Sequence, residues 1–376
     1  MLTTSIKIGQ HTFSNTHPCI IAEAGTAHGG SIQKAYALVD AAKEAGAHCV
    51  KFQHVYAGEI IHPRTGYVPL PGGDIPLYER FKDLEQSPDF FSQIKEYCTK
   101  KDIIFLCTPF GLRSARELHS IGIDAIKIAS PELNYVQLLE EIATYKIPVI
   151  ISSGVSTLSD IDKALRILSG LPTVLLHCIT AYPAPEEEYN VRVLNTLHAI
   201  TGVPCGISDH SLHPIFIPAL SIACGAVMIE KHLCLSRKDD GLDDPIALEP
   251  QDFSKMTRFI SQLAGQSPDA IFATIIQEFG KEKAEKALGD GIKQLAPSEY
   301  QNYGRTNRSL HARVALKPGE IFSDQNVAIL RTEKILTPGL SPELLPVIRG
   351  RIVRTYIEAG EGILWHNVGD IKTNID

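Results

Sequence analysis

The sequence predicts a parallel (β/α)₈ barrel, a TIM barrel, followed by a small second domain. Short apolar runs alternate with amphipathic helical stretches in one unbroken series of eight units. A doubly wound sheet would explain the alternation but not naturally the count of eight, and no GxGxxG follows the first run. The alternation stops near residue 265 of the 376, which leaves enough chain for a second domain.

Each expected strand is a short apolar run, and each is followed by a stretch with helical periodicity. In chain order we expect strands at 19–24, 49–54, 103–107, 125–128, 148–152, 173–177, 204–208 and 226–232. The helices are expected at 32–45, 90–99, 113–121, 136–143, 158–168, 191–200, 215–224 and 250–262.

Two segments interrupt this pattern. Residues 57–84 are rich in proline and glycine and read as a long loop after the second strand, on the face where barrel enzymes keep their chemistry. Residues 266–305 read as a partly helical linker, with one charged helical piece at 281–286. Beyond it, apolar patterns predict strands at 309–316 and 352–356. The predicted domains are therefore a barrel over 1–265, with an N-terminal extension over 1–17, and a small domain over 306–376.

Composition narrows the class of protein. The chain has 36 Lys+Arg against 43 Asp+Glu, a net charge of −7, so it is not expected to bind nucleic acid. A phosphate-bearing substrate requires cations gathered in one cleft. The longest stretch free of both charged residues and histidine, 214–229, is too short to span a membrane, and residues 1–7 contain no apolar signal core. The eight cysteines form no CxxC, which favours reduced core thiols in a cytoplasmic protein.

Polar residues mark the carboxyl end of every predicted strand, where barrel enzymes place their active sites. A row of this kind favours an enzyme over a purely structural barrel. The residues are Glu23; Lys51 and Gln53; Thr108; Lys127, Ser130 and Glu132; Ser152; His177 and Tyr182; Ser208, Asp209 and His210; and Glu230, Lys231 and His232.

Lys51 and Lys127 lie inside otherwise apolar strands. A lysine is almost never buried unless it is paired, so one reading is an ion pair with a carboxylate of the barrel. A second is a clamp for an anionic substrate such as a carboxylate or a phosphate. A third is a Schiff-base lysine, since burial lowers the pKa of an amine. The residues alone leave the last two readings open.

His210 and His232 end successive strands, which lie about 4.8 Å apart in a sheet, so both imidazoles can reach one metal ion. With Glu23, Glu230 and Asp243 near, such a pair suits a divalent transition ion acting as a Lewis acid on a carbonyl. The same pair could instead only bind substrate by hydrogen bonds. His177 fits a core histidine as well as a ligand.

At these residues the sequence resembles the sialic acid synthase family, the phosphoenolpyruvate-condensing synthases of nonulosonic acids. The likeness covers most of 18–260, and the small domain resembles the antifreeze-like (SAF) domain of that family. The barrel motifs are Ile21-Ala22-Glu23-Ala24-Gly25, Val50-Lys51-Phe52-Gln53, Thr108-Pro109-Phe110, Lys127-Ile128-Ala129-Ser130, Ser152-Ser153-Gly154, Leu176-His177-Cys178, Tyr182-Pro183, Ser208-Asp209-His210 and Glu230-Lys231-His232. Those of the small domain are Arg308-Ser309-Leu310, Leu316-Lys317-Pro318-Gly319-Glu320 and Ile348-Arg349-Gly350-Arg351.

The resemblance implies a transferase that joins phosphoenolpyruvate, an N-acetylated amino sugar and water, and releases phosphate. It implies Mn²⁺, or another divalent ion such as Mg²⁺ or Co²⁺, on His210 and His232. Glu23 would activate water or orient the aldehyde. The resemblance assigns phosphoenolpyruvate to Lys51, Lys127, Ser130 and Ser152, and the sugar to Gln53, Tyr182, Glu230 and Asp243; Thr108, Glu132 and Asp209 are counted with the substrate-binding residues. Arg308 would reach the sugar's N-acetyl group in the partner's barrel of a domain-swapped homodimer.

The sequence departs from the family pattern in several places. Ala27-His28-Gly29-Gly30 replaces Asn-His-Asn-Gly, Pro131 replaces a glycine, Thr180 replaces an asparagine, and Asn307 replaces the first of two arginines. These positions lie around the sugar end more than the phosphoenolpyruvate end, so the resemblance does not name the acceptor. The alternatives are a related aldol-type synthase with another aldose and a non-catalytic sugar-binding barrel.

Overall fold

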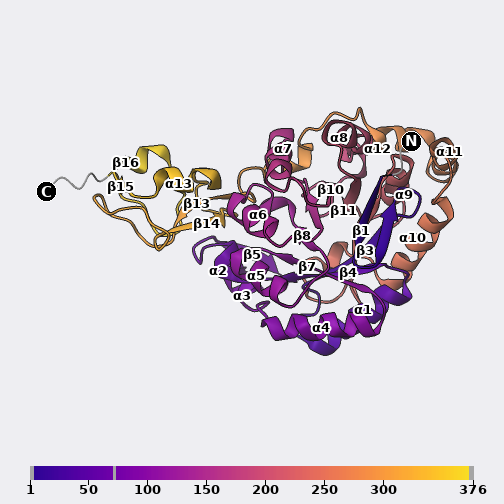
Figure 1. The fold of residues 1–376 in the computed structure, drawn as a ribbon, viewed down its shortest axis with the longest axis horizontal. Helices are drawn as coiled ribbons and strands as arrows, with labels where there is room; N and C mark the ends of the chain where they lie inside the picture. The colour runs from indigo at the N-terminus through magenta and orange to yellow at the C-terminus, as the bar shows by residue number, and fades with distance from the viewer. Residues whose placement is uncertain (1–3, 71–72, 372–376) are drawn as a thin grey trace.

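The computed structural model describes residues 4–70 and 73–371, and the parts of the predictions that concern 1–3, 71–72 and 372–376 lie outside it. Eight parallel strands form a nearly closed barrel in the order β7-β4-β3-β12-β11-β10-β9-β8 (Figure 1). β7 and β8 lie side by side at the seam, where no backbone ladder joins them within the described residues. The strands are β3 (Cys19–Gly25), β4 (Cys49–His54), β7 (Ile104–Pro109), β8 (Ile126–Ile128), β9 (Val149–Ser152), β10 (Thr173–Cys178), β11 (Cys205–Asp209) and β12 (Met228–His232).

A ring of helices covers the outside of these strands, and the main hydrophobic core fills the space between the two layers. The (β/α)₈ prediction is confirmed, with most helix boundaries within two residues of expectation. The helices are α1 (Ile32–Glu44), α4 (Pro88–Lys100), α5 (Leu112–Ser120), α6 (Val136–Ala143), α7 (Leu158–Ile167), α8 (Val193–Thr201), α9 (Phe216–Ala223) and α10 (Pro250–Leu263).

The barrel strands are buried on both faces, and successive side chains alternate between the lumen and the helices. In β3, Ile20 and Ala22 join the outer core, whereas Cys19 and Ile21 join a separate inner cluster. Continuing this alternation brings Glu23 into the lumen, one layer above Ile21. The inner cluster therefore forms an apolar floor at the amino ends of the strands, and polar side chains follow it at the carboxyl ends.

The N-terminal extension closes that floor. β1 (Ser5–Ile8) and β2 (His11–Ser14) pair as an antiparallel hairpin. Ile6, Ile8 and Phe13 of this hairpin are buried in the inner cluster. The hairpin thus seals the end of the barrel opposite the polar layer.

The segment 57–84 is not the irregular loop that the sequence predicts. It contains α2 (Ala57–Ile60), the antiparallel pair β5 (Tyr67–Leu70) and β6 (Gly73–Pro76), and α3 (Leu77–Lys82). Prolines are tolerated here because the pair is a two-stranded sheet with free edges. Ile60, Ile61 and Leu77 of the segment form a small apolar cluster with Val55 and Phe110, which follow β4 and β7.

Residues 266–305 are also more ordered than a linker. α11 (Pro268–Phe279) and α12 (Lys281–Leu288) pack beside α9. Ile271, Ile275 and Ala284 belong to the main core of the barrel. The predicted helical piece at 281–286 lies inside α12. Because the apolar face of α11 packs on the barrel, residues 266–305 belong to the outer layer of the barrel and are more than a linker.

The small domain is built from two short antiparallel pairs around its own core. β13 (Arg308–Ala312) pairs with β14 (Val327–Arg331), and β15 (Arg351–Val353) pairs with β16 (Val368–Ile371). The predicted strands at 309–316 and 352–356 are shorter than expected, because the chain leaves each ladder early and only an isolated bridge joins Leu316 to Ile357. The remaining short helices are α13 (Leu345–Ile348), η1 (Ser130–Glu132), η2 (Glu186–Glu188), η3 (Asp244–Ile246), η4 (Pro297–Glu299), η5 (Pro342–Leu344) and η6 (Trp365–Asn367).

All eight cysteines are buried free thiols, as the sequence predicts. Within residues 4–70 and 73–371, no helix is long and apolar enough to cross a membrane.

Candidate active site

A polar pocket opens at the carboxyl ends of the barrel strands. All eight strands, or the loops that follow them directly, contribute to its wall. Its lining residues are Glu23, Lys51, Gln53, Thr108, Lys127, Ala129, Ser130, Pro131, Ser152, Cys178, Tyr182, Ser208, His210, Glu230, His232 and Asp243.

Lys51 lies between two carboxylates of the pocket. Its Nζ is 2.8 Å from Glu23 Oε2 and 3.4 Å from Glu230 Oε2, and all three side chains are almost fully buried. Nζ also donates to Thr108 Oγ1 at 3.3 Å. Burial opposes the charge of Lys51, but Glu23 and Glu230 outweigh it and raise the pKa of the lysine. Lys51 is therefore charged and held in place by its anionic neighbours.

Lys127 differs because its direct partners are neutral. Its Nζ donates to Ser152 Oγ at 2.7 Å and to the Ile128 carbonyl at 3.0 Å. Burial lowers the pKa of Lys127, and Glu230 only partly compensates for it. An anionic ligand would supply the close partner that this ammonium lacks.

Glu230 balances the two lysines. Burial favours its neutral form, but Lys127 and Lys51, with a 2.8 Å hydrogen bond from Ser208 Oγ, lower its pKa to about 2. On the other side of Lys51, Glu23 accepts a 2.7 Å hydrogen bond from Gln53 Nε2. Glu23, Lys51, Glu230 and Lys127 thus place acidic and basic side chains next to one another in the pocket.

The two predicted metal ligands face each other across the pocket. The ring centres of His210 and His232 are 5.4 Å apart, and Tyr182 stacks on His210 at 4.2 Å. Burial and the neighbouring His210 lower the pKa of His232 to about 3. For His210, Cys178 and the Ile179 carbonyl outweigh burial and raise the pKa to about 9. These shifts favour a charged His210 beside a neutral His232, and a cation bound to both rings would displace the additional proton of His210.

The hydrogen bonds of His210 suit a metal ligand. Its Nδ1 donates to the Ile179 carbonyl at 2.7 Å, because a carbonyl can only accept, and this makes Nε2 the atom that would bind a cation once its proton is displaced. His232 Nδ1 lies 3.7 Å from Asp243 Oδ2. The described residues contain no group of three or more His, Cys, Asp and Glu side chains arranged to hold a metal. The residues fit an ion with two protein ligands and open positions.

The structure brings most of the predicted site residues together in the pocket wall. Twelve of the fifteen predicted catalytic and substrate-binding residues line the pocket, and the exceptions are Glu132, Asp209 and Arg308. His177, the ambiguous histidine, is a core residue that contacts the Tyr189 carbonyl at 2.7 Å.

Asp209 is a wrong prediction for a pocket residue, for a reason of register. It is paired with Lys231 in the ladder between β11 and β12, and the two side chains form a buried ion pair at 2.6 Å. Ser208 and Glu230, one position earlier in each strand, face the lumen. Asp209 and Lys231 therefore face the helices, and their charges satisfy each other outside the barrel.

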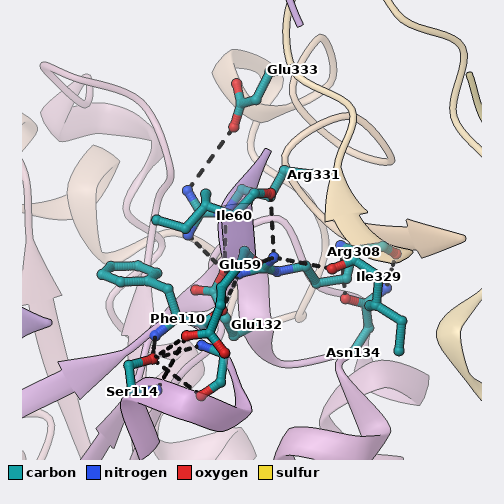
Figure 2. A network of polar contacts seen from close by, with 11 residues as sticks. Glu59, Ile60, Phe110, Ser114, Glu132, Asn134, Arg308, Ile329, Arg331 and Glu333 are labelled. Atoms are coloured by element: carbon teal, nitrogen blue, oxygen red, sulfur yellow. Dashed lines mark hydrogen bonds and ion pairs between the residues drawn. The ribbon is translucent and has the colours of Figure 1, made fainter. Parts of the chain in front are cut away.

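Glu132 and Arg308 join the small domain to the barrel, as Figure 2 shows. Arg308 is fully buried, and its Nη2 lies 2.9 Å from Glu132 Oε1. Arg331 approaches the same oxygen at 2.7 Å. Arg308 also donates to the carbonyls of Glu59 and Phe110. Within this chain the donors of Arg308 are directed at its own barrel, and the expected contact with a sugar in a partner's barrel stays a prediction.

We predict that Glu132→Ala lowers the free energy of unfolding by about 3–5 kcal/mol, because it leaves two arginines without their shared buried counter-charge. Denaturant unfolding measures this. The matched control is Glu343→Ala, which removes the exposed pair with Lys163 between the same two domains and is expected to cost about 0–1 kcal/mol. Equal losses for the two variants would contradict the assigned role of Glu132.

Sequence reasoning missed some pocket residues. The sequence predicts that Cys178, like the other cysteines, is a core thiol, yet its Sγ lies 3.8 Å from His210 Nδ1 in the pocket. Ala129 and Pro131 line the wall beside Ser130. Alternation along the sixth strand could have revealed Cys178, since Val174 and Leu176 lie in the inner cluster.

Comparison with known proteins identifies the family to which this chain belongs. The model of the NeuB family matches residues 38–269, and the SAF domain model matches residues 307–369. The chain belongs to the NeuB family. The prediction from its motifs is therefore confirmed.

Individual relatives are similar to this protein in sequence or structure over most of its chain. The crystal structure of the Bacillus subtilis spore coat polysaccharide biosynthesis protein SpsE superposes with a TM-score of 0.79 at 31% identity, covering 97% of this chain and 99% of that one. The N,N'-diacetyllegionaminic acid synthase of Campylobacter jejuni is 33% identical over 83% of this chain and 90% of its own length. The N-acetylneuraminic acid synthetase of Leptospira borgpetersenii has a TM-score of 0.64 at 31% identity, covering 74% of this chain and 98% of that one.

The relatives also settle the kind of reaction. The relatives from Campylobacter jejuni and Leptospira borgpetersenii are named as synthases of nonulosonic acids, so this NeuB-family chain is a transferase of the same type, as the sequence predicts. The relatives differ in the acid they make, so membership does not name the acceptor sugar of this chain.

Proposed function

We propose that this NeuB-family protein condenses phosphoenolpyruvate with an N-acetylated amino sugar and water, and releases phosphate. The observation that carries the proposal is the pocket itself, in which two buried lysines, two carboxylates and a histidine pair converge. The named relatives make sialic and legionaminic acids, and N-acetylmannosamine and the diamino-hexoses are the acceptors that we would test first.

The phosphoenolpyruvate end is proposed to lie at Lys51, Lys127, Ser130 and Ser152. Lys127 supports this most strongly, because its ammonium is buried against neutral partners. A phosphate or carboxylate there would gain charge-assisted hydrogen bonds in a site that excludes water. Thr108, which accepts from Lys51, stands at the edge of the same group.

The acceptor end is proposed to lie at Tyr182, Asp243, Gln53 and the two histidines. Tyr182 is half exposed and offers a flat apolar face beside His210, as a sugar ring requires. Glu23 stands between the two ends, held by Lys51 and Gln53. Its side chain would act as the base that takes a proton from the water that adds to C2, while C3 forms the new carbon–carbon bond.

We propose that His210 and His232 hold a divalent cation, Mn²⁺ first and Mg²⁺ or Co²⁺ as alternatives. When bound, the ion would supply Lewis-acid polarisation of the aldehyde oxygen of the acceptor. The hydrogen bond from His210 Nδ1 to the Ile179 carbonyl, which leaves Nε2 as the ligand atom, supports this assignment. Glu230 and Lys127 would keep the surrounding charge balanced.

The test is phosphate release. The protein is incubated with Mn²⁺, phosphoenolpyruvate and a panel of N-acetylhexosamines and diacetamido-hexoses, one at a time. We expect release with one acceptor class and none without acceptor. Absence of release with every acceptor, while calorimetry shows that phosphoenolpyruvate binds, would refute the proposal.

The lowered pKa of Lys127 also suits a second function, a Schiff-base aldolase. We expect no such chemistry, because Ser152 and the Ile128 carbonyl hold the ammonium as a donor. Treatment with pyruvate and borohydride separates the two functions. A mass increase on Lys127 would favour the aldolase.

We also propose that the protein is a cytoplasmic homodimer. Eight free buried thiols suit a reducing compartment. Ile335, Val347, Tyr356 and Trp365 expose large apolar side chains on the small domain, which favours a protein partner there. Light scattering after gel filtration gives the mass in solution, and a monomer at all concentrations would exclude the dimer.

A further inference from the structure

We propose that residues 293–307, the connecting segment that leads into the small domain, position the active site, and that Glu299 is the central positioning residue. The inference rests on the proposed function. Glu299 lies outside the pocket wall and touches no substrate position, so it would act through the loops that follow β9 and β10.

Glu299 joins two loops of the site. Its side chain is fully buried, and its Oε1 accepts from the backbone N–H of Val155 at 2.6 Å and of Thr180 at 2.8 Å. Its Oε2 accepts from the N–H of Ala296 at 3.1 Å, within the connecting segment itself. One carboxylate thus holds the loop after β9 and the loop after β10 at a fixed separation.

The same segment also holds the carbonyls of these two residues. Asn307 Nδ2 donates to the Val155 carbonyl at 3.0 Å, and Asn302 Nδ2 donates to the Thr180 carbonyl at 3.0 Å. Both backbone polar groups of Val155 and of Thr180 are therefore bonded to residues 293–307. Such complete pairing leaves these two peptide positions little freedom to move.

Val155 shows why the loop needs support. It has a φ of +42°, which is a strained conformation for a β-branched residue. Strain of this kind persists only where the surroundings fix it. The bonds from Glu299 and Asn307 lie directly on this residue and supply that constraint.

Each loop leads to a different half of the pocket. Val155 follows Ser152, the partner of Lys127, and Gly154, whose N–H donates to Ser130 Oγ at 3.0 Å. This is the proposed phosphoenolpyruvate end. Thr180 follows Ile179, whose carbonyl fixes the ring of His210. This is the proposed acceptor end, so Glu299 sets the distance between the two reactants.

The experiment measures the Michaelis constants of both substrates in four variants of the full-length protein. Glu299→Ala is expected to raise KM for both substrates and to lower kcat by about tenfold to a hundredfold, because misplacement of reactants by about 1 Å has effects of this size. Glu299→Gln keeps the oxygen that serves Val155 and Thr180, so it should restore most of the activity. Asn307→Ala should raise KM mainly for phosphoenolpyruvate, and Asn302→Ala mainly for the sugar.

The control is Tyr300→Ala, which changes an exposed side chain of the same segment and should leave both constants unchanged. Hydrogen exchange is the readout that does not depend on turnover, and the amides of Val155 and Thr180 should exchange faster in Glu299→Ala. A merely structural role would lower the melting temperature of the Ala and Gln variants alike and leave each KM at the wild-type value. That result, or equal effects of Asn302→Ala and Asn307→Ala on both substrates, overturns the inference.

The activity of the wild-type protein distinguishes a failure of the proposed function from a failure of the role assigned to Glu299. If it releases no phosphate with any acceptor, the proposed function fails and the inference falls with it. If the wild type is active and the Glu299 variants match it, only the inference fails.

Discussion

Lys127→Met is expected to reduce kcat/KM for phosphoenolpyruvate by about a hundredfold to a thousandfold while changing the free energy of unfolding by less than about 1 kcal/mol. The activity falls because Lys127 is the buried ammonium whose direct partners are neutral, and the substrate anion is proposed to complete its shell. Stability is spared because burial already disfavours this charge, as its lowered pKa indicates, and methionine fills a similar volume. Glu230 loses its attraction to Lys127 but keeps Lys51 and the Ser208 hydroxyl as direct partners.

Lys51→Met is the matched comparison and should behave differently. It leaves Glu23 and Glu230 buried without the cation between them, so it should cost about 3–5 kcal/mol of stability as well as activity. Denaturant unfolding and steady-state kinetics on both variants measure the contrast. Equal losses of stability in the two variants, or an unchanged KM for phosphoenolpyruvate in Lys127→Met, would contradict the different roles assigned to the two lysines.

His210→Ala and His232→Ala are each expected to abolish bound Mn²⁺ and to lower kcat by about three orders of magnitude or more, because one imidazole cannot hold the ion and the aldehyde loses its polarising charge. Elemental analysis of the purified variants gives the metal content per chain. The fold should survive, since both rings face the pocket and not the apolar core.

His177→Asn is the control for the histidine pair. His177 also ends a barrel strand and is buried, but it belongs to the outward set and contacts the Tyr189 carbonyl. This variant should retain its metal. If either pocket variant kept full metal content and activity, the metal assignment would be wrong.

The barrel could be predicted from sequence because each strand is a short buried run separated from the next by an amphipathic helix. The failures occurred where local composition pointed to irregular chain. Residues 57–84 carry prolines that suit a loop, yet Ile60 and Leu77 pack in an apolar cluster with Val55 and Phe110. Likewise, α11 lies in a segment read as a linker, and only its packing on α9 reveals why Ile271 and Ile275 are apolar.

The sequence predicts which residues lie at the strand ends, but not which of them point into the pocket. That depends on whether each side chain faces the lumen or the helices. Glu23 and Lys51 lie in the lumen, as expected, because they share the parity of the inner residues Ile21 and Cys49. Asp209 was misassigned because it follows Ser208 by one position and therefore faces outward. Counting positions along the strand would have corrected it.

Contacts between distant segments lay beyond any pattern in the sequence. Glu132 follows a strand end and looks like a substrate ligand, but it pairs with two arginines that are remote along the chain. Glu299 lies in a segment with no site motif, and only the folded chain brings its carboxylate to Val155 and Thr180.

The most direct test of the proposed reaction is the fate of the oxygen that bridges C2 and phosphorus in phosphoenolpyruvate. The substrate is labelled with ¹⁸O at that position, turned over with the productive amino sugar, and the released phosphate is weighed by mass spectrometry. Addition of water at C2 with cleavage of the C–O bond predicts that the phosphate carries the label. Unlabelled phosphate would mean attack at phosphorus and would contradict the account.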